Sequence, residues 1–296
     1  MQGIAFLITS VFSGLSIGFL GMGWTLMIAI AAMGLTFLHL LFVRIPESEP
    51  ERDPSAPGAL DFRGSVAAIR AAPGLFSLIV FSTFNNLIGG VYMALMDPYG
   101  LTLFNVQTWG FALAFSTTGF LIGGALVAKF GLGKKPVRTL LLVVIAMGIL
   151  GAVFMLREWW PLFVIGMWLY MMLIPPAEAA EQTVIQKVVP FTRQGRVFGA
   201  ASAMEAASAP ITAFLIAPIA EFLIIPYMRG DEGQQRWGWL LGEGEARGIA
   251  LICLFAGVII VVVAVLAFRT RSYRTLSALY EKVPDQEVTT AQPDPE

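Results

Sequence analysis

Several ionisable or amide side chains interrupt apolar stretches of this chain, where such groups are costly without a partner or a wet cavity. Glu205 stands in the run ASAMEAASAP, residues 201–210, among small residues. Glu181 and Gln182 follow Glu178 by three and four residues, so a helix would place all three on one face. Burial disfavours the charged form of a carboxyl, so these groups are candidates for carrying a proton or pairing with a cation.

Each of these positions also has a structural alternative. Glu205 can be a structural acid, neutral or hydrogen-bonded to a neighbouring helix, because the small residues around it favour close helix packing. Glu178, Glu181 and Gln182 lie near one end of their apolar segment, where a solvated carboxylate costs little. Their functional alternative is a gate or a substrate contact.

The composition identifies the kind of element that carries these residues. Hydrophobic residues make up 57% of the 296 residues, charged residues only 13%, and the mean hydropathy is +0.75. Average globular chains are about one quarter charged, whereas long uncharged apolar stretches mark membrane spans. We therefore expect an all-α integral membrane protein in the lipid bilayer. The net charge of −1 offers no basic field for nucleic acid.

Uncharged runs of about 20 residues predict eight spans. The run 1–43 would be about 64 Å long as one helix, so we expect a hairpin that breaks near Gly21 and Gly23. The other six predicted spans cover residues 74–95, 108–128, 139–156, 159–180, 197–220 and 248–268.

Basic residues predict the orientation, because positively charged loops stay in the cytoplasm. Alternate loops hold 15 and 4 of the 19 Lys and Arg residues, which predicts that both termini are cytoplasmic. We expect the membrane to be a cell membrane, the inner membrane of a bacterium. The predicted organisation is two helices in 1–44, a cytoplasmic linker in 45–72, six helices in 73–270 and a cytoplasmic tail in 271–296. We expect the tail to be disordered after Arg274, since it ends in AQPDPE.

The spans differ in polarity, which predicts their surroundings. Spans 139–156 and 248–268 have almost no hydrogen-bonding side chains and can face lipid. Asn85 and Asn86 occupy the middle of span 74–95; adjacent helical residues point about 100° apart, so we expect one of them to face a cavity. Either can instead hydrogen-bond between helices. The spans that carry the Asn pair, Glu178 and Glu205 should line an interior.

No motif in the sequence supports a catalytic or metal-binding function instead. GLSIG, residues 14–18, matches a serine nucleophile pattern, but that pattern requires a strand, a turn and a helix. Within an apolar helix the same glycines form a G-x-x-x-G packing motif. The chain has no H-E-x-x-H, cysteine pair or phosphate-binding glycine loop, so we expect neither an enzyme nor a metal or other cofactor.

Two predicted inner loops carry a family resemblance. QKVVPFTRQGRVFG, residues 186–199 with Arg193, Gly195 and Arg196, resembles the loop before the penultimate helix of drug-efflux members of the major facilitator superfamily, macrolide-efflux-like ones in particular. GALVAKFGLGKK, residues 124–135, is similar to the superfamily's G-x-L-A-D-R-x-G-R-R loop. The positions that fit are Gly124, Leu126, Lys129 and Gly131, while Ala128 replaces the acid and the basic pair slips to Lys134 and Lys135.

The resemblance implies a proton-coupled exporter of amphipathic small molecules or drugs that works by alternating access. Family members have two six-helix halves, so this chain would lack the first four helices. A fragment that does not transport, or a half-transporter that needs a partner half, is the alternative. Glu205 lies nine residues beyond Arg196, about 13 Å deep, near the midplane where transporter sites lie.

Arg193 and Arg196 have two interpretations of their own. Basic residues at the inner end of a span set its topology and contact lipid phosphates. They can also close an inner gate through an ion pair with Glu178 or Glu181.

Overall fold

The structure is a computed structural model that describes residues 12, 16, 17, 19–43, 69, 72–244 and 246–282, and all regular elements in these residues are helices. Seven of the helices are long and apolar enough to cross a membrane. The elements are α2 (Met22–Phe42), α4 (Leu75–Leu103), α5 (Val106–Phe130), α6 (Pro136–Val153), α7 (Trp160–Val188), α8 (Phe191–Ile219), the π-helix η1 (Ala220–Ile224), α9 (Ile225–Arg229), α10 (Asp231–Leu241), α11 (Arg247–Arg269) and α12 (Arg271–Lys282).

The predicted all-α membrane fold is confirmed. Seven of the eight predicted spans coincide with membrane-length helices, while most of the first, before Gly21, lies outside the described residues. Gly21 directly precedes α2 with φ +82°, a backbone conformation that favours glycine, so the predicted break of the hairpin occurs there. The predicted linker, residues 45–72, also falls almost entirely outside the described residues.

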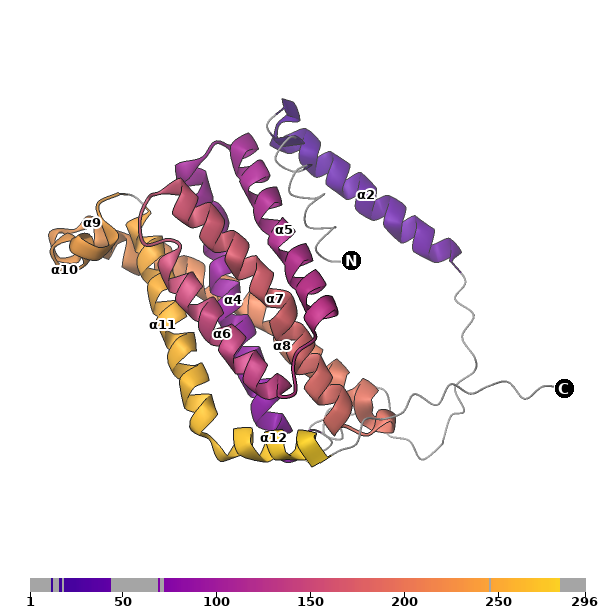
Figure 1. Ribbon diagram of the computed structural model, residues 1–296. Helices are drawn as coiled ribbons and strands as arrows, with labels where there is room; N and C mark the ends of the chain where they lie inside the picture. Colours follow the sequence, from indigo (N-terminus) through magenta and orange to yellow (C-terminus); the bar gives the residue numbers. More distant parts are fainter. Residues whose placement is uncertain are drawn as a thin grey trace.

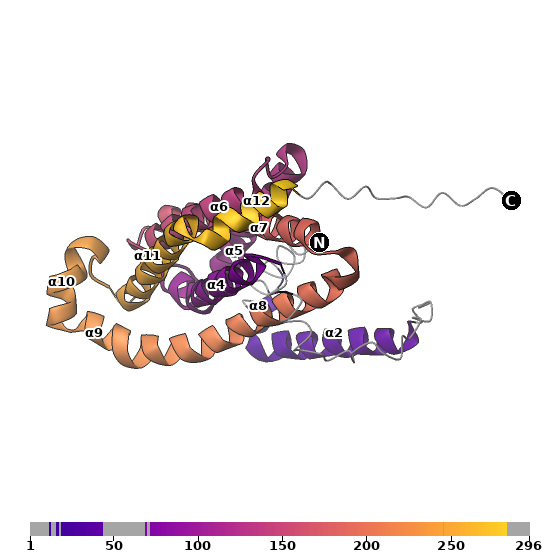
Figure 2. The ribbon, with the colours of Figure 1, turned by 90° about the horizontal axis from the view of Figure 1, so that it is seen from below.

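Helices α4 to α8 and α11 lie side by side as one bundle, and α12 crosses one end of it (Figure 1). The closest pairs are α5 with α7, α7 with α6, α6 with α11, and α4 with α8. Figure 2, seen from below, shows α12 lying across the bundle, where it contacts α4, α6 and α7. Helix α2 has no buried residue.

Glycines set the closest approaches between these helices. A Cβ atom on Gly123 of α5 would overlap the carbonyl oxygen of Met172 on α7. Because Pro176 has no N–H, that carbonyl lacks its usual helical partner, and Gly123 lets α5 pack directly against it. Gly148 of α6 and Gly257 of α11 face each other in the same way. Close backbone packing of this kind is the main source of helix association in lipid.

The two least polar spans pair with each other. Helices α6 and α11 bury Met147, Gly257 and Ile260 in the bundle, while other side chains stay open to the surroundings, such as Leu142 on α6 and Val262 on α11, each 49% exposed. Only one side of each helix is therefore exposed and able to face lipid, as predicted, while the other side is buried in the bundle.

Several predicted boundaries were wrong. Helix α7 continues to Val188, eight residues beyond the predicted end of its span at residue 180. Helix α4 continues eight residues beyond Leu95, through Asp97 and Pro98, because the indole Nε1 of Trp109 donates to Asp97 Oδ1 at 2.9 Å. The tail after Arg274 was expected to be disordered, yet residues up to Lys282 belong to helix α12. The cause is its amphipathic pattern, which places Leu276, only 2% exposed, beneath the bundle.

Candidate functional site

Three helices bring polar side chains together inside the bundle. Glu181 on α7 lies next to Glu205 on α8 and next to the hydroxyl of Ser82 on α4. Glu181 is 9% exposed and Ser82 is 3% exposed, while Glu205 is half-buried. The arrangement follows from the sequence, because each of the three spans carries polar groups that need a protein partner or a cavity at membrane depth.

Two atoms of this cluster lack a hydrogen-bond partner. Ser82 Oγ and Glu181 Oε1 are both buried and make no hydrogen bond of good geometry with a described residue, although the Ser82 hydroxyl and the Glu181 carboxyl lie close enough to interact. A buried polar atom without a partner costs about 1–3 kcal/mol. The cluster therefore has unused capacity to bind a proton or a hydrogen-bonding molecule.

Glu178 extends the cluster toward a more open position. It lies almost one helical turn from Glu181 on α7, within electrostatic range of Glu205, and its side chain is exposed. Within the part of the chain that the structure describes, no ion pair joins Glu178, Glu181 or Glu205 to a basic residue. The carboxyls thus depend on protons, or on a cation from elsewhere, to neutralise them.

Hydroxyl groups fix α8 against α4 beside this cluster. Ser208 Oγ donates to the Thr83 carbonyl at 3.2 Å, and Thr212 Oγ1 donates to the Leu87 carbonyl at 2.9 Å. These two bonds hold the helix that carries Glu205 in register with the helix that carries Ser82.

The other polar residues predicted in the spans, Gln182, Asn85 and Asn86, are more exposed than Glu181 and Ser82. Gln182 is exposed. Asn86 is exposed and its Nδ2 donates to the Ser82 carbonyl of its own helix at 3.0 Å, whereas Asn85 is half-buried. The asparagines therefore differ in their surroundings, as expected for adjacent helical residues.

The residues of the inner-loop motif 124–135 lie at the end of α5 and in the loop after it. Gly131 follows α5 with φ +67°, which ends the helix and favours glycine there. Lys129 is exposed, with Nζ 5.3 Å from the centroid of the Phe130 ring. A Cβ atom on Gly124 would meet no atom within 4 Å, so packing within the described residues does not require glycine there.

The inner-loop motif 186–199 joins the end of α7 to the start of α8. Arg193, Gly195 and Arg196 are exposed, and among the described residues no ion pair links either arginine to Glu178 or Glu181. The gate contact considered from the sequence is absent from this structure.

Sequence reasoning missed Ser82 and a second polar cluster at the other end of the bundle. Ser82 gives no signal, since single serines are common in membrane helices. Arg247 was counted only as a loop residue, yet it is 1% exposed and forms an ion pair with Glu158. Its position directly before an apolar run was the available signal.

A family model described as Major Facilitator Superfamily matches residues 1–213, which include α4 to α7 and most of α8. This chain belongs to the major facilitator superfamily. It is therefore a multi-pass member of a family of secondary transporters, not of enzymes. No curated protein and no solved structure matches it. In this transporter no cluster of three or more His, Cys, Asp or Glu residues that could hold a metal ion occurs among the described residues.

Proposed function

We propose that this transporter exports amphipathic small molecules in exchange for protons, with Glu181 and Glu205 as the coupling pair. The observation that carries the proposal is the contact between these carboxyls on two helices, next to the buried Ser82 hydroxyl. A buried pair of like charges favours holding at least one proton.

Proton and substrate would compete for this pair. When both carboxyls are ionised, their charge attracts the cationic or hydrogen-bonding part of a substrate. When one carboxyl takes up a proton, that attraction falls and the substrate leaves. Because Glu181 lies on α7 and Glu205 on α8, protonation also changes the repulsion between two helices.

The experiment measures transport by the full chain in inside-out membrane vesicles. An imposed pH gradient, acidic inside, should drive uptake of a fluorescent amphipathic cation, and a protonophore should abolish that uptake. Uptake that continues unchanged without the gradient would refute proton coupling.

The half-transporter alternative is supported by a different observation. Large apolar side chains cover the open side of α8, which carries Glu205, and of η1, which follows it. Phe214 on α8 is 81% exposed and Phe222 on η1 is 71% exposed. A partner half would bury this surface and complete the cavity. If uptake occurs only after further helices encoded upstream in the same reading frame are supplied, this alternative is correct.

A further inference from the structure

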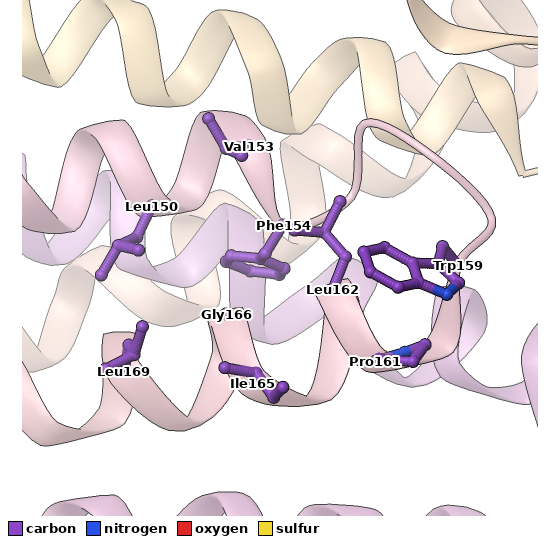
Figure 3. Close-up of a pocket in the computed structure, with 9 residues that line it drawn as sticks. All are labelled: Leu150, Val153, Phe154, Trp159, Pro161, Leu162, Ile165, Gly166 and Leu169. Atoms are coloured by element: carbon purple, nitrogen blue, oxygen red, sulfur yellow. The ribbon is translucent and has the colours of Figure 1, made fainter.

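A narrow apolar groove lies between α6 and α7, away from the carboxyl cluster. Its volume is about 200 Å³, below the roughly 300–1,000 Å³ of typical small-molecule sites. Figure 3 shows Leu150 and Leu169 at one end of the groove and Trp159 and Pro161 at the other. Its lining also includes Val153, Phe154, Leu162, Ile165 and Gly166, so all nine residues are apolar.

Gly166 creates the depth of the groove. A Cβ atom at this position would overlap Cβ of Phe154, so only glycine lets the start of α7 approach the end of α6 so closely. Val153 and Ile165 form exposed walls, being 39% and 53% exposed. The groove therefore results from the packing of the two helices and opens toward their exposed side.

The length of the groove equals the depth of one leaflet. Trp159 and Leu169 are ten residues apart, which is about 15 Å of helical rise, or half of the ~30 Å hydrocarbon core. Trp159 and Trp160 are 59% and 60% exposed at the loop end, where interfacial tryptophans lie.

Polar contacts at the loop end suit a lipid headgroup. The Trp159 indole N–H can donate to a phosphate or ester oxygen. Arg157, two residues before it, is exposed; its Nη2 donates to the Trp239 carbonyl at 2.9 Å, and no acidic side chain among the described residues neutralises its charge. Its positive charge complements a phosphate.

We infer that this groove binds one phospholipid, with an acyl chain between α6 and α7 and its phosphate and ester region at Trp159. Lipid tails are as apolar as leucine, so burial alone does not favour this place over the rest of the bilayer. A phospholipid should prefer the groove because its acyl chain makes close van der Waals contacts there and its headgroup finds polar contacts at the loop end. This inference is independent of the proposed transport function.

The test uses the full chain in nanodiscs of phosphatidylethanolamine and phosphatidylglycerol, doped with a phospholipid that carries a diazirine on one acyl chain. After illumination, mass spectrometry should find the cross-links several-fold enriched in residues 150–169. The reference surface is the smooth exposed face of α11 around Val258 and Val262, which are 47% and 49% exposed.

Matched variants distinguish lipid bound in the groove from lipid that contacts any exposed helix surface. Ile165→Trp should fill the groove and remove most of the enrichment, while Val262→Trp on α11 should leave it unchanged. Val153→Trp provides a second filling variant. Equal labelling of both surfaces, or enrichment that survives both filling variants, would overturn the inference.

The headgroup contact has its own control. Trp159→Phe keeps the apolar lining but removes the N–H donor, so enrichment should fall, whereas Trp160→Phe should have no effect because Trp160 does not line the groove. Equal results for the two variants would overturn the assigned headgroup contact.

Discussion

The guanidinium of Arg247 lies 2.8 Å from Glu158 Oε1, and this ion pair joins the start of α11 to the loop before α7. Arg247 Nη1 also donates to the carbonyls of Leu156 at 3.1 Å and Leu241 at 2.7 Å, and Nη2 donates to the Tyr99 hydroxyl at 3.2 Å. One buried cation therefore holds four parts of the chain at the end of the bundle opposite α12.

Removing the counterion should destabilise this end of the bundle. Glu158→Ala leaves the buried Arg247 charge without its acid. Because Glu158 itself is 38% exposed, we expect a loss of about 2 kcal/mol in unfolding free energy. Thermal unfolding in detergent measures the change. The control is Glu281→Ala, which removes an exposed ion pair, 3.2 Å from Lys135 and about half exposed, and should cost less than about 1 kcal/mol. Equal losses for both variants would contradict a special role for the buried pair.

Replacement of two adjacent glycines on α5 should affect stability differently. Gly123→Val forces a side chain into the Met172 carbonyl, so we expect a loss of roughly 1–3 kcal/mol or more. Gly124→Val meets open space and should leave thermal stability unchanged. Stability that falls equally in both variants would mean that α5 does not pack on α7 as described.

The docking of α12 should depend on Leu276. Replacing this 2% exposed side chain by Ala removes apolar contact beneath the bundle and should cost roughly 2–3 kcal/mol of docking energy. Hydrogen exchange in residues 271–282 should then accelerate. Ala278→Ser, at an exposed position of the same helix, is the control and should not change the exchange. Unchanged protection in Leu276→Ala would show that other contacts hold α12.

Two hydroxyl groups lie beside the carboxyl cluster, and we expect removal of one to lower stability and removal of the other to change transport. Thr212→Val removes a bond to the Leu87 carbonyl and should lower the unfolding free energy by about 1 kcal/mol. Ser82→Ala removes the hydroxyl beside Glu181, which makes no hydrogen bond of good geometry, so stability should change little while the pH profile of transport changes. An unaltered pH profile in Ser82→Ala would exclude this hydroxyl from the site.

The sequence predicted those parts of the fold that depend on hydropathy alone. Uncharged runs identified the spans because a bilayer tolerates few charges, and polar residues such as Glu181 and Glu205 identified the helices that meet inside. Local rules failed where tertiary contacts outweigh them. Asp97 and Pro98 resemble a helix end, but a bond from Trp109 lets α4 continue through them.

The details of the site were beyond sequence reasoning for a similar reason. The sequence placed Glu205 at membrane depth, but which acid faces it depends on the packing of α7 against α8. The structure brings Glu181 next to it and leaves Gln182 exposed. Ser82 enters the site only because α4 packs along α8 through Ser208 and Thr212.

The most direct test of proton coupling compares the pH dependence of transport in Glu181→Gln, Glu205→Gln and the double variant. All three proteins are reconstituted in vesicles with an imposed pH gradient. The two carboxyls are in contact, and residues that act as a unit have non-additive effects. If Glu181 and Glu205 form the proposed coupling pair, each single variant should therefore abolish gradient-driven uptake and the double variant should lose no more. Glu221→Gln, at an exposed acid in η1, is the control and should transport normally. Gradient-driven uptake that persists in the double variant would contradict the account.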